Sequence, residues 1–307
     1  MARRYSRIRG WSMAHHRIEG DDLGEAGYFQ LLMHGIFAGC EPSVLKVIDK
    51  MIRSGILQGR WRPLFKSIRD ASVLLPRGEV VSSQRAKEFI DSISTSGRLE
   101  ITVGPCVCQE ALGVNQGIHV KDMAVLYGAD LYQSVKPGYK NMSSEEIKSL
   151  FDDLDKEGCM PVFFACMNSK GWMVVICNCD GEICVPVRVH QIMGGVLSPG
   201  PDIIELNPGK CTSCGRCIRR CHFGANRNVD GSLKTDLDRC YGCGICVSTC
   251  PKGARRLKAR KNYLNRYYPI DFVNRFKERS LQERIAASAW EKESRQSINQ
   301  TSPDAQR

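Results

Sequence analysis

The sequence predicts an α+β fold in which a larger mixed α/β region precedes a small cysteine-rich unit and a C-terminal helix. Helical and strand periodicities alternate through the first two thirds of the chain, a four-cysteine motif then occurs twice, and Ser198-Pro-Gly-Pro201 separates the two parts. The 307 residues leave room for two ordinary domains. The expected divisions are a basic segment at 1–22, an α/β cysteine-bearing domain at 23–197, a cysteine-rich domain at 201–258, and a basic helix and tail at 259–307.

The N-terminal segment does not predict export. Arg3-Arg4 lies in a basic stretch, but no apolar run follows it. We therefore expect a cytoplasmic protein, where thiols stay reduced and clustered cysteines more often hold metal or perform redox chemistry. The chain has 16 cysteines. No stretch of about 18 uncharged apolar residues occurs, so we expect no membrane-spanning helix.

Helix and strand signals follow one another along the N-terminal region. Apolar residues at helical spacing predict helices within residues 23–70. Ser143, followed by Ser144, Glu145 and Glu146, carries the N-cap chemistry that starts a helix. The other expected elements are a short strand from Arg77, a helix at 83–93, a strand at 100–103, and a hairpin of strands at 161–167 and 172–179.

A four-cysteine motif beginning at Cys211 recurs 29 residues later, and each copy has the spacing C-x2-C-x2-C-x3-C. Two-residue gaps let a tight loop place three thiolates on a cubane, while the fourth thiolate must come from elsewhere in the fold. Gly215 and Gly244 keep each loop free of a Cβ near the cubane. Zinc sites, the alternative, normally use C-x2-C pairs alone. The motif therefore predicts two [4Fe–4S] clusters.

With this motif, residues 201–258 resemble a two-cluster bacterial-type ferredoxin. The resemblance implies a ferredoxin-type dicluster domain with short hairpins and two short helices, Asp230-Gly231 being the turn of one hairpin. His222 stands where the second copy has Pro251, and it either hydrogen-bonds a cluster sulfur or fills space. The implied ligands are Cys211, Cys214, Cys217 and Cys250 for one cluster, and Cys240, Cys243, Cys246 and Cys221 for the other.

Cysteines also gather in the N-terminal region. Cys177 and Cys179 share one face of the expected return strand, because side chains alternate along a strand. Cys106-Val-Cys108, if extended, also presents both sulfurs to one side. A third site, with zinc or another cluster, and ordinary packing of reduced cysteines both stay open. The possible additional site comprises Cys106, Cys108, Cys166, Cys177, Cys179 and Cys184.

A second resemblance covers residues 77–190. It is carried by Cys106-Val-Cys108, His119, Tyr127-Gly128, the helix at 143–157 and Cys177-Asn-Cys179. These features are similar to a module upstream of ferredoxin domains in uncharacterised proteins of anaerobes. Ala124 and Asp180 occupy positions where that module has cysteine, which argues against transferring a metal site from it. His119 and His190 lie near the segment and could also serve as ligands.

The chain is basic, with a formal net charge of +11. Residues 252–279 carry ten Lys or Arg and two acids, with aromatic residues between them, and a helix is expected at about 271–290. Such a stretch can bind nucleic acid or dock an acidic protein. Two bound clusters with their thiolates lower the net charge to roughly +5 to +7. We therefore expect a redox partner protein with an acidic docking face rather than nucleic acid.

These observations favour an iron–sulfur electron-transfer protein of an anaerobe, which passes single electrons between redox partners, over a stand-alone enzyme. The alternative is a redox enzyme subunit whose N-terminal domain holds a further metal or cluster fed by the ferredoxin domain. The sequence contains no phosphate-binding loop, dinucleotide loop or nucleophile elbow, so no catalytic residue is assigned. Arg219 and Arg220 lie beside the predicted ligands, and their charge should raise the reduction potential.

Overall fold

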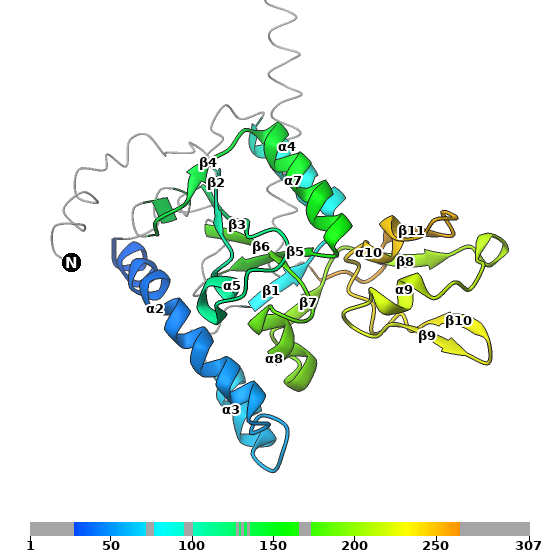
Figure 1. Ribbon diagram of the computed structural model, residues 1–307, viewed down its shortest axis with the longest axis horizontal. Coiled ribbons are helices and arrows are strands. Elements are labelled where there is room, and N and C mark those ends of the chain that lie inside the picture. Colours follow the sequence, from blue (N-terminus) through cyan, green and yellow to red (C-terminus); the bar gives the residue numbers. More distant parts are fainter. Residues whose placement is uncertain are drawn as a thin grey trace, which may run out of the picture.

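The computed structural model describes residues 28–71, 77–94, 101–126, 129, 132–133, 136–165 and 173–264. Three sequence predictions therefore lie outside the described residues: the basic segment at 1–22, the site residue Cys166, and the C-terminal helix at 271–290. The described part combines helices with mixed sheets, which confirms the α+β class (Figure 1).

A seven-stranded sheet forms the centre of the N-terminal region, in the order β4-β2-β3-β6-β5-β1-β7 (Figure 1). Neighbouring strands are antiparallel, except that β1 and β7 run parallel. The expected hairpin is confirmed as β5 and β6, with Met160 opposite Cys179 and Val162 opposite Cys177. The strands are β1 (Arg77–Val80), β2 (Ile101–Pro105), β3 (Val120–Leu126), β4 (Lys140–Asn141), β5 (Met160–Ala165), β6 (Met173–Cys179) and β7 (Leu197–Pro199).

Helices α4 (Ser83–Ser94) and α7 (Ser144–Glu157) cover one face of this sheet. Each buries an apolar stripe at helical spacing, which includes Phe89 and Ile93 on α4 and Ile147, Phe151 and Leu154 on α7. The predicted start of α7 is confirmed by a capping box, in which the Ser143 hydroxyl accepts a hydrogen bond from the Glu146 N–H and the Glu146 carboxylate accepts one from the Ser143 N–H.

The opposite face packs against α2 (Tyr28–Arg53), α5 (Val107–Leu112) and α8 (Val185–Met193), while α3 (Arg62–Ala71) continues the chain from α2. A second buried apolar cluster lies here and includes Leu45, Met160, Val162 and Phe164. The cysteines of the N-terminal region concentrate on this face, because Cys108, Cys179 and Cys184 belong to the same cluster. No described helix is long and apolar enough to cross a membrane.

The cysteine-rich unit, residues 202–259, forms two small antiparallel sheets beside the large one (Figure 1). The hairpin predicted at Asp230-Gly231 is confirmed: both residues have positive φ, at 52° and 76°, and join two paired strands. The elements are β8 (Asp202–Leu206), η2 (Pro208–Lys210), α9 (Arg216–Arg219), β9 (Asn226–Val229), β10 (Ser232–Thr235), α10 (Ile245–Ser248) and β11 (Arg255–Ala259).

Polar contacts tie the cysteine-rich unit to the N-terminal region. The Arg85 guanidinium makes an ion pair with the buried Asp202 carboxylate at 2.9 Å, and the Ser82 hydroxyl donates to the same carboxylate at 3.3 Å. On the other side of the junction, Arg220 donates to the carbonyl oxygens of Asp155 and Lys156 at 2.9 and 2.8 Å. Arg220 thus hydrogen-bonds the free carbonyl groups at the C-terminal end of α7, where the helix dipole favours a cation.

Candidate redox centre

The two copies of the cysteine motif adopt the same backbone conformation. Gly215 and Gly244 are the N-caps of α9 and α10, with positive φ of 72° and 82°. This left-handed conformation favours glycine because it strains a β-carbon, while the expected clearance from a cubane stays a prediction.

The fourth cysteine of each copy also has the same environment. The N–H of Ala225 donates to Cys221 Sγ at 3.3 Å, and the N–H of Ala254 donates to Cys250 Sγ at 3.3 Å. Backbone N–H groups aimed at sulfur stabilise a thiolate and tune a bound cluster. The sequence repeat is thus a structural repeat.

Four cysteines from both copies line one small cavity, namely Cys221, Cys240, Cys243 and Cys246. Apolar residues, among them Ile204 and Ala225, enclose it. Burial raises the pKa of the Cys246 thiol to about 11 and that of Cys243 further, so neither ionises readily without a cationic partner. A cavity lined by four sulfurs fits a polynuclear iron–sulfur group, whose iron ions hold such thiols as thiolates.

The remaining cysteines of the repeat, Cys211, Cys214, Cys217 and Cys250, include its one exposed member. Cys214 is exposed, and its hydrogen bond with the Arg216 backbone lowers the pKa of its thiol. Cys217 is buried, and burial raises its pKa. The two predicted ligand sets therefore differ in that one reaches the surface at Cys214, whereas Cys243 of the other packs against the N-terminal region.

The choice between clusters and zinc at the repeat rests on the spacing of its cysteines. Zinc sites normally use C-x2-C pairs alone, whereas each copy here adds a third and a fourth cysteine.

Arg255 places a buried cation between the two sets. The residue is 4% exposed, and its guanidinium lies 3.8 Å from Cys246 Sγ and donates to Thr235 Oγ1 at 3.2 Å. It also partly offsets the rise that burial causes in the pKa of Cys217. Arg255 therefore touches one cysteine of each predicted ligand set. Its charge stabilises added negative charge there more strongly than an exposed arginine does.

An aromatic cluster joins the cysteine-rich unit to α8. The rings of Phe223 and Tyr241 stack with centroids 4.0 Å apart, and His190 packs edge-on to both. His190 Nδ1 accepts from the Leu197 N–H at 3.0 Å, so Nε2 carries the proton and donates to the Tyr241 hydroxyl at 2.6 Å. Tyr241 lies between the first two cysteines of the second copy. His190 thus positions this loop, and it does not line the cysteine cavity of the N-terminal region.

The structure gives His222 a role that the sequence did not predict. The His222 Nε2 forms a 2.7 Å hydrogen bond with the carbonyl oxygen of Gly158, just beyond α7. The Gln191 side-chain amide donates a hydrogen bond to the backbone carbonyl oxygen of His222 at 3.0 Å. His222 therefore fastens the cysteine-rich unit to the N-terminal region. The expected bond to a cluster sulfur stays a prediction.

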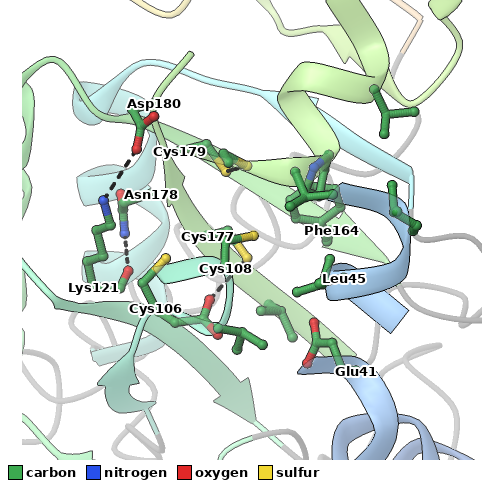
Figure 2. Close-up of a pocket in the computed structure, with 18 of the residues that line it drawn as sticks. Glu41, Leu45, Cys106, Cys108, Lys121, Phe164, Cys177, Asn178, Cys179 and Asp180 are labelled. Carbon is green, nitrogen blue, oxygen red and sulfur yellow. Dashed lines mark hydrogen bonds and ion pairs between the residues drawn. The ribbon is translucent and has the colours of Figure 1, made fainter. Parts of the chain in front are cut away.

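A second cavity, of about 120 Å³, lies in the N-terminal region between α2, α5, β6 and α8 (Figure 2). Five of the six cysteines predicted as an additional site line it: Cys106, Cys108, Cys177, Cys179 and Cys184. The opposite wall is apolar and includes Leu45 and Phe164 (Figure 2). The predicted convergence of these cysteines is thus observed, while its use for metal stays a prediction.

One detail of that prediction is wrong. Residues 106–108 are not extended: Cys106 is the N-cap of α5, and Cys108 lies in its first turn. Helix α5 begins directly after β2 because the Cys106 N–H donates to the His119 carbonyl oxygen at 2.8 Å, a contact that turns the chain at the sheet end. Both sulfurs still reach the cavity from the helix end.

Two cavity cysteines touch each other. Cys179 Sγ at the end of β6 and Cys184 Sγ at the start of α8 are 3.1 Å apart. Hydrogen bonding with Cys177 and Cys184, together with burial, raises the pKa of Cys179. Burial opposes ionisation of Cys184 as well, but hydrogen bonding with Cys108 and Cys179 outweighs it and lowers the pKa of Cys184. The cavity therefore concentrates thiols in hydrogen-bond contact.

Buried polar residues complete the cavity, and the sequence reasoning missed them. Lys121, 3% exposed, lies 3.7 Å from the Asp180 carboxylate (Figure 2). Asp122 accepts hydrogen bonds from Tyr139 and Cys177 at 2.6 and 3.0 Å. Asn178 Oδ1, also in the lining, is buried and has no hydrogen-bond partner. The signal available in the sequence was the pair Lys121-Asp122 inside an otherwise apolar strand.

Comparison with known proteins identifies the second region. Residues 210–259 match the family model described as a 4Fe-4S dicluster domain, so this segment is a ferredoxin-type iron–sulfur domain. No curated protein matches the chain. The family match does not reach residues 77–190, and the resemblance of that part to a module of anaerobe proteins stays a prediction.

Proposed function

We propose that the protein is an electron carrier of anaerobic, cytoplasmic metabolism that holds two [4Fe–4S] clusters and passes single electrons between redox partners. The observation that carries this proposal is the structural equivalence of the two cysteine runs, down to matching N–H···S bonds at Cys221 and Cys250. The ferredoxin-type family match supports the iron–sulfur role. When bound, each cluster supplies reversible one-electron chemistry.

Each of the two predicted ligand sets would hold one cluster. Cys211, Cys214, Cys217 and Cys250 would hold the cluster near the surface, and Cys221, Cys240, Cys243 and Cys246 the one near the N-terminal region. Arg255 would stabilise the reduced state of both, because it faces Cys217 and Cys246. Exposed Cys214 marks the edge at which an electron enters or leaves.

The partner at that edge should be acidic. A hollow beside α9 and α10 is lined by Arg216, Arg219, Arg220 and Lys156, with Asp155, Ser248 and Thr249. Arg216 and Arg219 are exposed there, close in sequence to Cys214. Such a basic hollow attracts an acidic redox protein and speeds its docking at low salt.

A second candidate function is favoured by the cysteine-lined cavity of the N-terminal region. Five thiols, a buried lysine and an unpartnered amide oxygen line one space next to the ferredoxin-type domain. This arrangement favours a redox subunit in which the N-terminal region performs chemistry with electrons from the clusters.

The test is the iron and acid-labile sulfide content of protein purified without oxygen. We expect about eight of each per chain. About four of each would contradict the two-cluster count, and zinc without sulfide would contradict electron transfer altogether.

A further inference from the structure

A pair of thiols in contact in the N-terminal region joins two elements that approach the ferredoxin-type domain. Cys179 ends β6, and Cys184 caps α8 after only four intervening residues. Their sulfurs are 3.1 Å apart, and the two residues are 3% and 5% exposed. A disulfide bond, at about 2.05 Å, requires these sulfurs to move together by roughly 1 Å.

The spacing of this pair differs from that of metal ligands. Sulfurs around a tetrahedral zinc ion lie about 3.8 Å apart, given a Zn–S distance of about 2.3 Å. A cubane separates its thiolates further, because each one binds a different iron. The geometry suits a pair of thiols that exchange with a disulfide.

The pair shares a buried apolar cluster with the ferredoxin-type domain. Cys179 and Cys184 pack in the cluster that contains Ile245 of α10, and Tyr241 and Cys243 pack against it. Helix α8, which Cys184 caps, also holds His190, the residue that donates to the Tyr241 hydroxyl. The pair therefore lies on the side of the domain where the better-buried ligand set is found.

We infer that Cys179 and Cys184 form a redox-active dithiol, which in its disulfide form accepts two electrons, one at a time, from the ferredoxin-type domain. The inference rests on the proposed electron-transfer function for the source of these electrons. The S–S bond breaks, each sulfur gains one electron, and each takes one proton from water, which gives two thiols. Two one-electron centres match this two-electron step.

The dithiol is reoxidised by a substrate disulfide, of a small molecule or of a protein, through thiol–disulfide exchange. One thiolate attacks the substrate and releases the first substrate thiol. The second thiol of the pair then attacks the mixed disulfide and displaces the remaining substrate sulfur as a thiol. The substrate thus leaves as two thiols, and the Cys179–Cys184 bond forms. The cavity gives the pair a space to meet a substrate, and the Asn178 amide oxygen is available to accept a hydrogen bond from it.

The experiment uses the full-length protein with its clusters, purified without oxygen and incubated with oxidised glutathione. After an acid quench, alkylation and digestion, mass spectrometry should find a Cys179–Cys184 disulfide in the unaltered protein and in Cys106→Ser, but not in Cys184→Ser. Cys106 is the matched control, because it lines the same cavity and, in the described part of the chain, no hydrogen bond joins its thiol to Cys179 or Cys184. Visible absorption of the clusters verifies that each variant is folded.

A reductive titration then counts the electrons. The oxidised protein should take up about four electrons per chain, and Cys184→Ser about two. Equal uptake by both, or no disulfide after oxidation, would overturn the inference while a normal cluster signal leaves the proposed function intact. Loss of iron or zinc in Cys184→Ser would also overturn it, in favour of a third metal site. If the unaltered protein forms the disulfide but, as purified without oxygen, contains no clusters, the inferred source of the electrons and the proposed function would both be overturned.

Discussion

The two cysteine-rich regions of this molecule use the same side chain in opposite ways. In the ferredoxin-type domain, glycine-capped turns place eight cysteines in two equivalent runs, and a backbone N–H points at the sulfur of the fourth cysteine of each run. In the N-terminal region, the cavity cysteines come from a strand and from the starts of two helices, and two sulfurs are in contact. Thiols that turns keep in equivalent places suit a cluster, whereas thiols in contact suit chemistry between sulfurs.

Replacing one cysteine in each region tests this difference, with the largest expected effect. We expect Cys243→Ser to lose about half of the iron and sulfide, because Cys243 lines the four-sulfur cavity. Cys179→Ser is the matched control and should keep all of it. Metal analysis and visible absorption provide the measurement. Equal loss in both variants would show that the two regions do not differ in this way.

The contact between the regions can be weakened at Asp202. This carboxylate is 5% exposed and makes an ion pair with Arg85 at 2.9 Å. Asp202→Asn removes the buried carboxylate charge, leaves the Arg85 guanidinium its ion pair with Glu88, and should lower the free energy of unfolding by about 1–3 kcal/mol. Asp236→Asn, which breaks the exposed pair with Arg227, should cost less than about 1 kcal/mol. Urea denaturation followed by circular dichroism compares them, and equal costs would contradict the account.

Acid should weaken the same junction through His190. Burial, followed by the charge of Arg69, lowers the pKa of His190 to about 4, from an ordinary value of 6.5. The unfolded chain therefore binds a proton more tightly, so the stabilisation is complete above about pH 6.5 and is lost as the pH falls toward 4. The full loss is about 2 kcal/mol, after allowance for the partial exposure of the ring.

The measurement is urea denaturation at pH 7.5 and at pH 5.5, for the unaltered protein and for His190→Gln. The glutamine cannot take up a proton, so the variant should lose less stability over this interval. The same pH dependence in both proteins would show that His190 is not responsible.

The smallest expected effect concerns the reduction potential. Arg255 is buried beside Cys246, whereas Arg219 is exposed. Arg255→Gln should lower the potential by tens of millivolts, and Arg219→Gln should lower it less, because solvent screens an exposed charge. Redox titration of the cluster absorption measures both. A larger shift at Arg219 would place the controlling charge at the surface instead.

Local signals in the sequence predicted most of the secondary structure. The cysteine spacing, the Asp230-Gly231 turn and the Ser143 cap each act within a few residues, and all three are found in the structure as expected. The helix expected at 83–93 is likewise found as α4. Such features depend on local backbone chemistry, which the sequence displays directly.

Contacts between distant segments could not be predicted. His222 hydrogen-bonds a carbonyl oxygen 64 residues away in the sequence. The N–H of Cys106, the residue at which the chain passes from β2 into α5, donates to the carbonyl oxygen of His119. The charged pair Lys121-Asp122 was visible, but its burial beside the cysteines depends on the pairing of β3 with β6. The C-x-C pairs therefore indicated convergence without showing which sulfurs touch.

The most direct test of the whole account is the electron paramagnetic resonance spectrum of the fully reduced protein, integrated against a spin standard. The account predicts about two spins per chain, one for each cluster of the ferredoxin-type domain, because reduced cavity thiols contribute none. About one spin would contradict the two-cluster carrier. About three spins would show that the cavity cysteines hold a further cluster and contradict the difference drawn between the two regions.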